Sequence, residues 1–145
     1  MAASVIEQIL ARVAAALTGT TGAGANVYRG RADAFADDEI PALNIRRASS
    51  SEDSIGETGA RIVATFDIEH HIDDLADWET AADALHMQVH AVLAADTQLA
   101  ALGHGLRCTG SDAQSDSADR VVGRLVTHYQ MQVFVRPHDL TKSIN

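Results

Sequence analysis

Histidines are the residues with the clearest potential for chemistry here, because seven of them occur in 145 residues and neutral imidazole is a common metal ligand. His86 and His90 are four residues apart, so on a helix they would share one face, as the histidines of many zinc sites do. Met87, however, stands where the H-E-x-x-H motif has its general-base glutamate. The pair also flanks an apolar stripe, which favours boundary residues of a half-exposed helix over metal ligands.

The run Glu69-His70-His71 lies in a segment with strand periodicity, where successive side chains point to opposite faces. These three residues therefore do not form one cluster, and we expect solvated strand residues. The acidic run 37–39 lacks the D-x-D-x-D-G spacing of an EF-hand and indicates carboxylates on a surface loop.

Nucleophilic catalysis has no better support. The sequence has no G-x-S-x-G elbow, and no glycine-rich phosphate loop follows a strand. Cys108 is the only cysteine, which excludes an intramolecular disulfide, and it has no motif around it. We therefore predict that the protein is not an enzyme and has no catalytic residue, cofactor or metal site.

The composition predicts one soluble domain over residues 1–145. The formal net charge is -9, with 20 acidic and 11 basic residues, whereas nucleic-acid binders normally show a basic patch. No segment approaches the roughly 20 apolar residues that span a bilayer, so we expect no membrane contact. The N-terminus lacks the positive region of a signal peptide, which indicates a protein made and kept in a cytoplasm.

Two helices are predicted from apolar stripes at helical spacing. Residues 4–17 begin with Ser4 and Glu7, the pattern of a capping box, and residues 78–95 follow Asp77, a favourable N-cap. Residues 99–102 are expected to add a further turn.

Strands are predicted at 26–30, 42–46, 61–72 and 121–135, with a further strand between the second helix and the last strand. The polar segments 49–60 and 109–119 indicate long hairpin loops. Pro137 ends the last strand, and residues 136–145 are expected to form a flexible tail. The predicted fold is α+β, with a mostly antiparallel sheet of four to five strands and two helices packed on one face.

The two polar loops are reasonable docking elements in an assembly, although composition alone equally allows simple flexible hairpins. Basic residues occur on the strands around them. The candidate assembly contacts are Arg46, Arg47, Ser50, Glu52, Asp53, Glu57, Asp112, Asp116 and Arg120.

The order of several short segments resembles the tail terminators (minor tail protein U) of lambda-like phages. The first is Val27-Tyr28-Arg29-Gly30-Arg31-Ala32-Asp33-Ala34-Phe35, followed by Asp38-Glu39-Ile40-Pro41-Ala42-Leu43. Near the other end, Ser117-Ala118-Asp119 leads into a long last strand through Tyr129. The helices and the polar hairpin tip occur in the same order, so the resemblance extends over nearly the whole chain.

This resemblance implies a structural virion protein that forms a hexameric ring at the head-proximal end of a long non-contractile tail. Such a ring stops polymerisation of the major tail-tube protein and presents the surface for the head-tail connector or head-completion protein. The 49–60 hairpin is then a candidate for reaching the tube, and DNA passes through the lumen without specific binding. The protein would be assembled in the cytoplasm of the host bacterium and located in the virion.

Three alternatives remain open at the level of sequence. The first is another tail- or head-completion protein of similar size. The second is a small metal- or ligand-binding enzyme that uses His86, His90 and a carboxylate, and the third is a generic oligomeric α+β adaptor.

Overall fold

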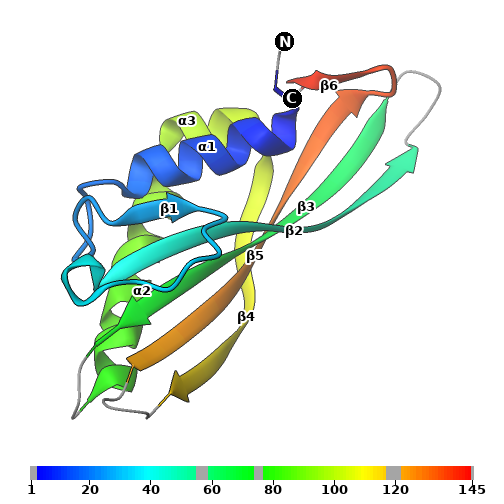
Figure 1. Cartoon of the computed structure of the whole chain (residues 1–145). Helices are drawn as coiled ribbons and strands as arrows, with labels where there is room; N and C mark the ends of the chain where they lie inside the picture. The colour runs from blue at the N-terminus through cyan, green and yellow to red at the C-terminus, as the bar shows by residue number, and fades with distance from the viewer. Residues whose placement is uncertain (1–2, 55–58, 74–76, 117–121, 145) are drawn as a thin grey trace.

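The computed structural model describes residues 3–54, 59–73, 77–116 and 122–144. Within these ranges it has three α-helices, one 3-10 helix and six strands (Figure 1). Their order is α1 (Val5–Leu17), β1 (Val27–Arg29), η1 (Asp37–Glu39), β2 (Ala42–Ser54), β3 (Ala60–Ile72), α2 (Trp78–Ala95), α3 (Thr97–Leu102), β4 (His104–Asp116), β5 (Val122–Arg136) and β6 (Asp139–Ser143).

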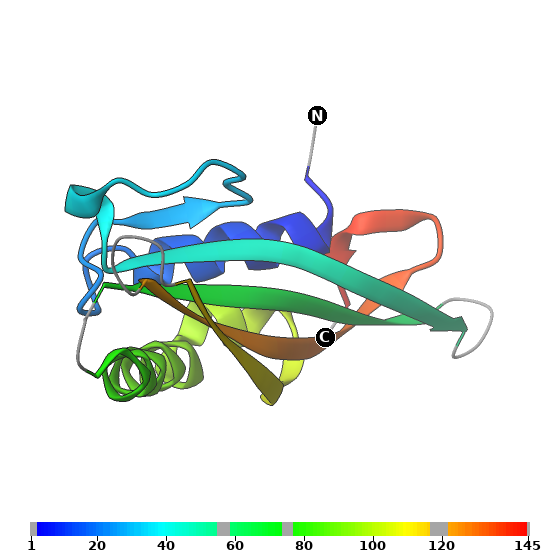
Figure 2. The same cartoon turned by 60° about the horizontal axis from the view of Figure 1, so that its bottom comes forward.

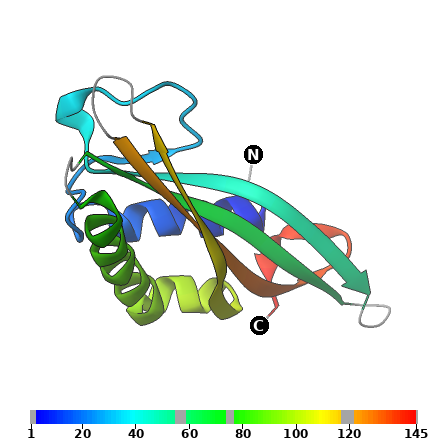
Figure 3. The ribbon, with the colours of Figure 1, turned by 90° about the horizontal axis from the view of Figure 1, so that it is seen from below.

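The strands form one sheet in the order β1-β2-β3-β5-β4, with β6 paired to β5. All pairs are antiparallel except β1 with β2, which is parallel. The three α-helices lie on one face of the curved sheet, and the segment between β1 and β2 reaches over the other face (Figures 2 and 3). The α+β class with helices on one face is therefore confirmed, with α3 and β6 as additional elements.

Alternation of side chains in the long central strands produces the core. In β3 the even-numbered residues are buried against the helices, among them Phe66 and Ile68, and in β5 the odd-numbered Tyr129 and Met131 are buried beside them. The predicted apolar stripes of both helices face this layer, with Ile9 of α1 fully buried. A one-residue slip would expose every one of these side chains, so this pattern fixes the strand register.

Polar caps hold the helices at defined positions. The Ser4 hydroxyl accepts a hydrogen bond from the Glu7 amide at 3.2 Å, which confirms one half of the predicted capping box, but the Glu7 carboxylate turns to Arg29 instead. Asp96 caps α3 by accepting from the Leu99 amide and forms a 2.7 Å ion pair with Arg12 of α1. This carboxylate therefore joins α3 to α1.

Parts of two segments predicted as loops are strands in the structure. Residues 49–54 belong to β2 and residues 109–116 to β4, whereas 55–58 and 117–119 lie outside the described residues. These parts of β2 and β4 pair with a central strand, β3 or β5, whose own alternation fixes their conformation. The sequence did not predict these strands because both segments are rich in acidic residues and glycine, which are depleted in strands, and have few large apolar residues.

The C-terminal segment also differs from the flexible tail expected for 136–145. After Pro137 the chain turns back, and β6 pairs with β5. The Gln8 side chain of α1 donates a 2.7 Å hydrogen bond to the Thr141 carbonyl oxygen. These contacts position the C-terminal strand against the first helix.

Candidate interaction groove on the uncovered sheet face

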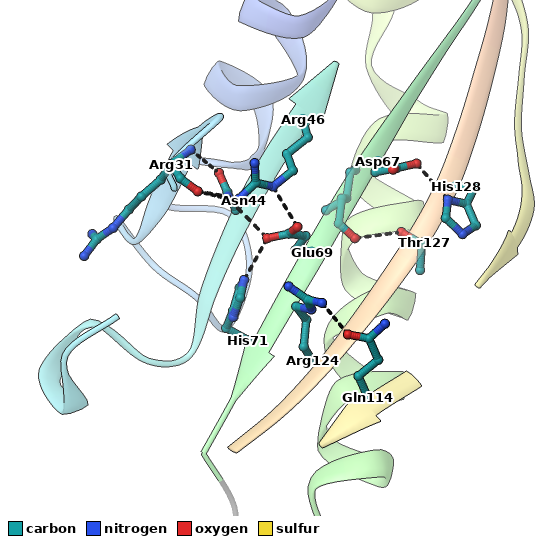
Figure 4. Close-up of polar contacts among 11 residues, drawn as sticks. Arg31, Asn44, Arg46, Asp67, Glu69, His71, Gln114, Arg124, Thr127 and His128 are labelled. Atoms are coloured by element: carbon teal, nitrogen blue, oxygen red, sulfur yellow. Dashed lines mark hydrogen bonds and ion pairs between the residues drawn. The ribbon is translucent and has the colours of Figure 1, made fainter. Parts of the chain in front are cut away.

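The sheet face opposite the helices carries polar and charged side chains that bond across strands (Figure 4). His128 of β5 lies between Asp67 of β3 at 2.7 Å and Asp112 of β4 at 2.8 Å. Hydrogen bonds to Asp67 and Asp112 raise the pKa of His128 above its usual value. The His128 ring therefore bridges three neighbouring strands, and the predicted contact residue Asp112 is one of its partners.

Glu69 of β3 is the centre of a second network. Its carboxylate accepts hydrogen bonds from Arg46 at 2.7 Å and Asn44 at 3.1 Å, and it lies 3.0 Å from the His71 ring nitrogen. Burial alone would raise the pKa of Glu69, but the hydrogen bonds from His71 and Asn44 and the charge of Arg46 lower it to about 2. The prediction that Glu69 is solvated is therefore wrong, because only 6% of this residue is exposed.

Arg31 fixes the segment that reaches over this network. Its guanidinium binds both oxygens of Glu39, at 2.6 and 3.0 Å, and lies over the rings of Tyr28 and Phe35. Its backbone N–H donates to the Asn44 side chain. Glu39, expected as one of three solvated surface carboxylates, is instead an ion-pair partner whose pKa is lowered to about 2, chiefly by Arg31.

Arg31, Arg46, Glu69 and His71 are among the residues that surround a groove of about 680 Å3. Its floor is formed by outward-facing residues of β2 and β3, one wall by the segment 31–40 and the other by the ends of β4 and β5. The lining residues are Arg31, Ala32, Asp33, Ala34, Phe35, Ile40, Arg46, Glu69, His71, Gln114, Ser115, Val122 and Arg124. Three of them are arginines, and two, Asp33 and Glu69, are carboxylates.

The predicted contact residues do not form one surface. Arg46 lies in the groove, whereas Arg47 points to the helix side, where its charge helps to lower the pKa of Glu7. This separation follows from strand alternation, because neighbouring residues face opposite sides.

The other predicted contacts lie along the outer parts of the long strands. Ser50, Glu52 and Asp53 are exposed near the far end of β2, and Asp53 forms a 2.7 Å ion pair with Arg61. Asp116 is the last residue of β4. Glu57 and Arg120 lie outside the described residues.

The histidines of α2 contact the helix-facing side of the sheet. The His86 ring packs against His70 at 5.5 Å between centroids, and His90 Nδ1 lies 3.1 Å from the Tyr129 hydroxyl. Burial lowers the pKa of His70 to about 4, so this side chain is neutral at pH 7 rather than a solvated strand residue. In the described part of the chain, no group of three or more His, Cys, Asp or Glu side chains is placed to hold a metal ion.

Sequence reasoning missed Asn44 and Arg31 as parts of the site. Asn44 looks like an ordinary polar residue in an alternating strand, and its role depends on the pairing of β2 with β3, which places it opposite Glu69. The available signal was the shared face of Glu69 and His71, two residues apart on a strand.

Among the described residues, no helix has both the length and the apolar composition that a membrane span requires.

Comparison with known proteins identifies a structural relative. No protein-family model matches the chain, and no curated protein matches it in sequence. Among solved structures, the chain is similar to a chain of the "virion of native gene transfer agent (GTA) particle", with a TM-score of 0.53. The two chains share a fold. Their sequences are 20% identical, and the match covers 90% of this chain and 92% of the other.

Proposed function

We propose that this protein is a structural component of a phage-like virion, and more specifically a tail terminator that forms a hexameric ring at the head-proximal end of the tail. The fold shared with a chain of a virion particle over nearly the whole length carries this proposal. The terminator assignment rests in addition on the order of segments from Val27 to Leu43 and through Tyr129. The ring would stop growth of the tail tube and join the head, a structural role that needs no catalytic centre.

The edges of the sheet support association with further subunits. β4 is an edge strand of 13 residues, and most of its residues are exposed. On the opposite side, β1 pairs only with Leu43–Ile45, so the rest of β2 also forms an edge. Open edges present unpaired backbone donors and acceptors that another chain can use.

The positions of the two long hairpins support contacts with two different partners. The β2–β3 hairpin leaves the sheet where Ala60 pairs with Val135, and the β4–β5 connection lies where Ile72 pairs with Gly123. These points are the two ends of the 13-residue strand β3, about 40 Å apart at roughly 3.3 Å per residue. The two ends of the sheet are therefore far enough apart to contact two different molecules.

The acidic composition suits the same role. A net charge of -9 disfavours binding of the phosphate backbone, so DNA can pass through a lumen without being retained.

Two measurements together test the proposal. Native mass spectrometry and negative-stain imaging of the purified protein should reveal rings of six subunits. Immunogold labelling of purified particles should place the protein between head and tail. Label confined to tailless heads would indicate a head-completion protein instead, and a monomer or dimer absent from particles would reject a virion role.

A further inference from the structure

Among the described residues that line the groove on the uncovered sheet face, one arginine has no carboxylate partner. Arg31 is paired with Glu39 and Arg46 with Glu69. The guanidinium of half-buried Arg124, in contrast, donates to the amide oxygen of Gln114 and contacts no carboxylate within the described residues. The groove therefore offers a preorganised arginine to an acidic group from outside the chain.

The far end of β2 carries the complementary charge. Glu52 is exposed and forms no ion pair within the described residues, and next to it the exposed Asp53 is bound to Arg61. This end of the β2–β3 pair projects beyond the helices (Figure 1). An extended pair of strands of this kind can reach a neighbouring molecule.

The two charged surfaces lie at opposite ends of the sheet. Arg124 pairs with His71 near one end of β3, whereas Glu52 pairs with Ile62 near the other end. A surface at one end that complements a surface at the opposite end gives a head-to-tail contact between identical chains. Such contacts close into a ring when the rotation between subunits permits.

We propose that the groove receives the acidic end of β2 from a second copy of this chain, with Glu52 of one subunit paired with Arg124 of the next. This inference deepens the proposed ring by naming its subunit contact. A second copy is favoured over an unrelated partner because the chain itself supplies both charges of the contact. Two copies of a chain with net charge -9 repel each other, and a contact that places Arg124 of one copy against acidic Glu52 of the other offsets this repulsion.

Charge reversal tests this contact. Arg124→Glu and Glu52→Arg should each reduce subunit association by about 10- to 100-fold, because each places two like charges opposite one another at the contact. An equimolar mixture of the two variants should restore rings, because alternating subunits then present two complementary contacts. Ring content is measured by native mass spectrometry, or by decoration of tail tubes if the wild-type ring forms only there.

Lys142→Glu is the control. It makes the same change of charge at an exposed residue of β6, outside both the groove and β2, and should leave ring content unchanged. Circular dichroism checks that each variant is folded, and Arg124→Gln, which keeps a polar side chain, should show a smaller defect than Arg124→Glu. Rings in Arg124→Glu as abundant as in Lys142→Glu, or a mixture that stays dissociated, would overturn the inference.

The outcome separates this contact from the proposed function. Rings that persist in Arg124→Glu and remain at the head-proximal tail end reject the groove contact but leave the terminator role intact. Restoration of rings by mixing, in a protein that immunogold labelling does not find in virions, supports the contact and rejects the terminator role.

Discussion

His70 shows how burial on the helix-facing side turns an ordinary titratable residue into a determinant of stability. Its pKa is lowered from 6.5 to about 4 by burial, with Nδ1 bonded to the Leu125 carbonyl oxygen at 3.0 Å. Between these two values the unfolded chain binds a proton that the folded chain does not. The stability that neutral, buried His70 contributes is therefore fully present above pH 6.5 and is lost progressively as the pH falls towards 4.

His70→Leu should remove this pH dependence. In the wild type, the His70 contribution should lower the free energy of unfolding by roughly 2 kcal/mol between pH 7 and pH 5. Urea denaturation of both proteins at the two pH values measures the difference, which cancels the contributions of His86 and His128. An equal loss of stability in both proteins would mean that His70 is accessible to protons in the folded state.

Glu69 has the opposite effect on the uncovered face. Because its pKa in the folded protein is about 2, below the ordinary 4.5, its ionised form stabilises the fold above pH 4.5, and this stabilisation is lost as the pH falls to 2. Glu69→Gln should destabilise the protein by about 1–3 kcal/mol at pH 7, since Arg46 loses its charged acceptor. The substitution should also flatten the dependence of the urea midpoint on pH below pH 4.5. If the midpoint of the variant changed with pH as steeply as that of the wild type, the network would not be the cause.

At the scale of elements, the contact between α2 and β5 depends on a glycine. A Cβ atom at Gly123 would overlap the indole ring of Trp78, the first residue of α2, so the ring occupies the space that a side chain would take. Gly123→Ala should therefore displace Trp78 and cost about 1–3 kcal/mol, as overpacking usually does. Trp78 is the only tryptophan, so a red shift of its emission reports the displacement directly. Unchanged emission and stability would show that α2 adjusts without strain.

The same scale shows which elements sequence can predict. The helices and the central strands were predicted because each buries one face, and the resulting 3.6- or two-residue periodicity is visible in the sequence. Residues 50–53 and 110–115 have no such periodicity, because these parts of β2 and β4 are exposed. Their conformation comes from pairing with β3 and β5, a long-range effect that local composition does not carry.

The site was predictable to a smaller extent for a related reason. Arg46 was identified as a contact candidate from its charge and its place beside a polar segment, and it does line the groove. The ion pairs that neutralise Arg31 and Arg46 depend on the β1–β2 segment folding over the sheet and on the register of β2 with β3. Sequence spacing alone therefore could not separate the paired arginines from Arg124.

At the scale of the whole molecule, charge sets the condition for assembly. Each chain carries a net charge of -9, so the subunits of the proposed ring would repel one another over distances comparable to the Debye length. This length falls from about 30 Å at 0.01 M salt to about 8 Å at 0.15 M, whereas close, partly buried ion pairs are screened much less. Raising the salt concentration should therefore favour formation of the proposed ring by weakening the long-range repulsion, while the proposed Glu52–Arg124 contact should persist.

Sedimentation velocity at one protein concentration, in 0.01 M and 0.15 M sodium chloride, measures this effect. We expect the fraction of protein in rings to rise with salt, and to rise less in a variant with fewer negative charges, such as Glu79→Gln, which changes an exposed residue in the first turn of α2. Dissociation of rings on addition of salt would show instead that exposed ion pairs dominate subunit association. In that case, the net charge of the subunit would not limit assembly.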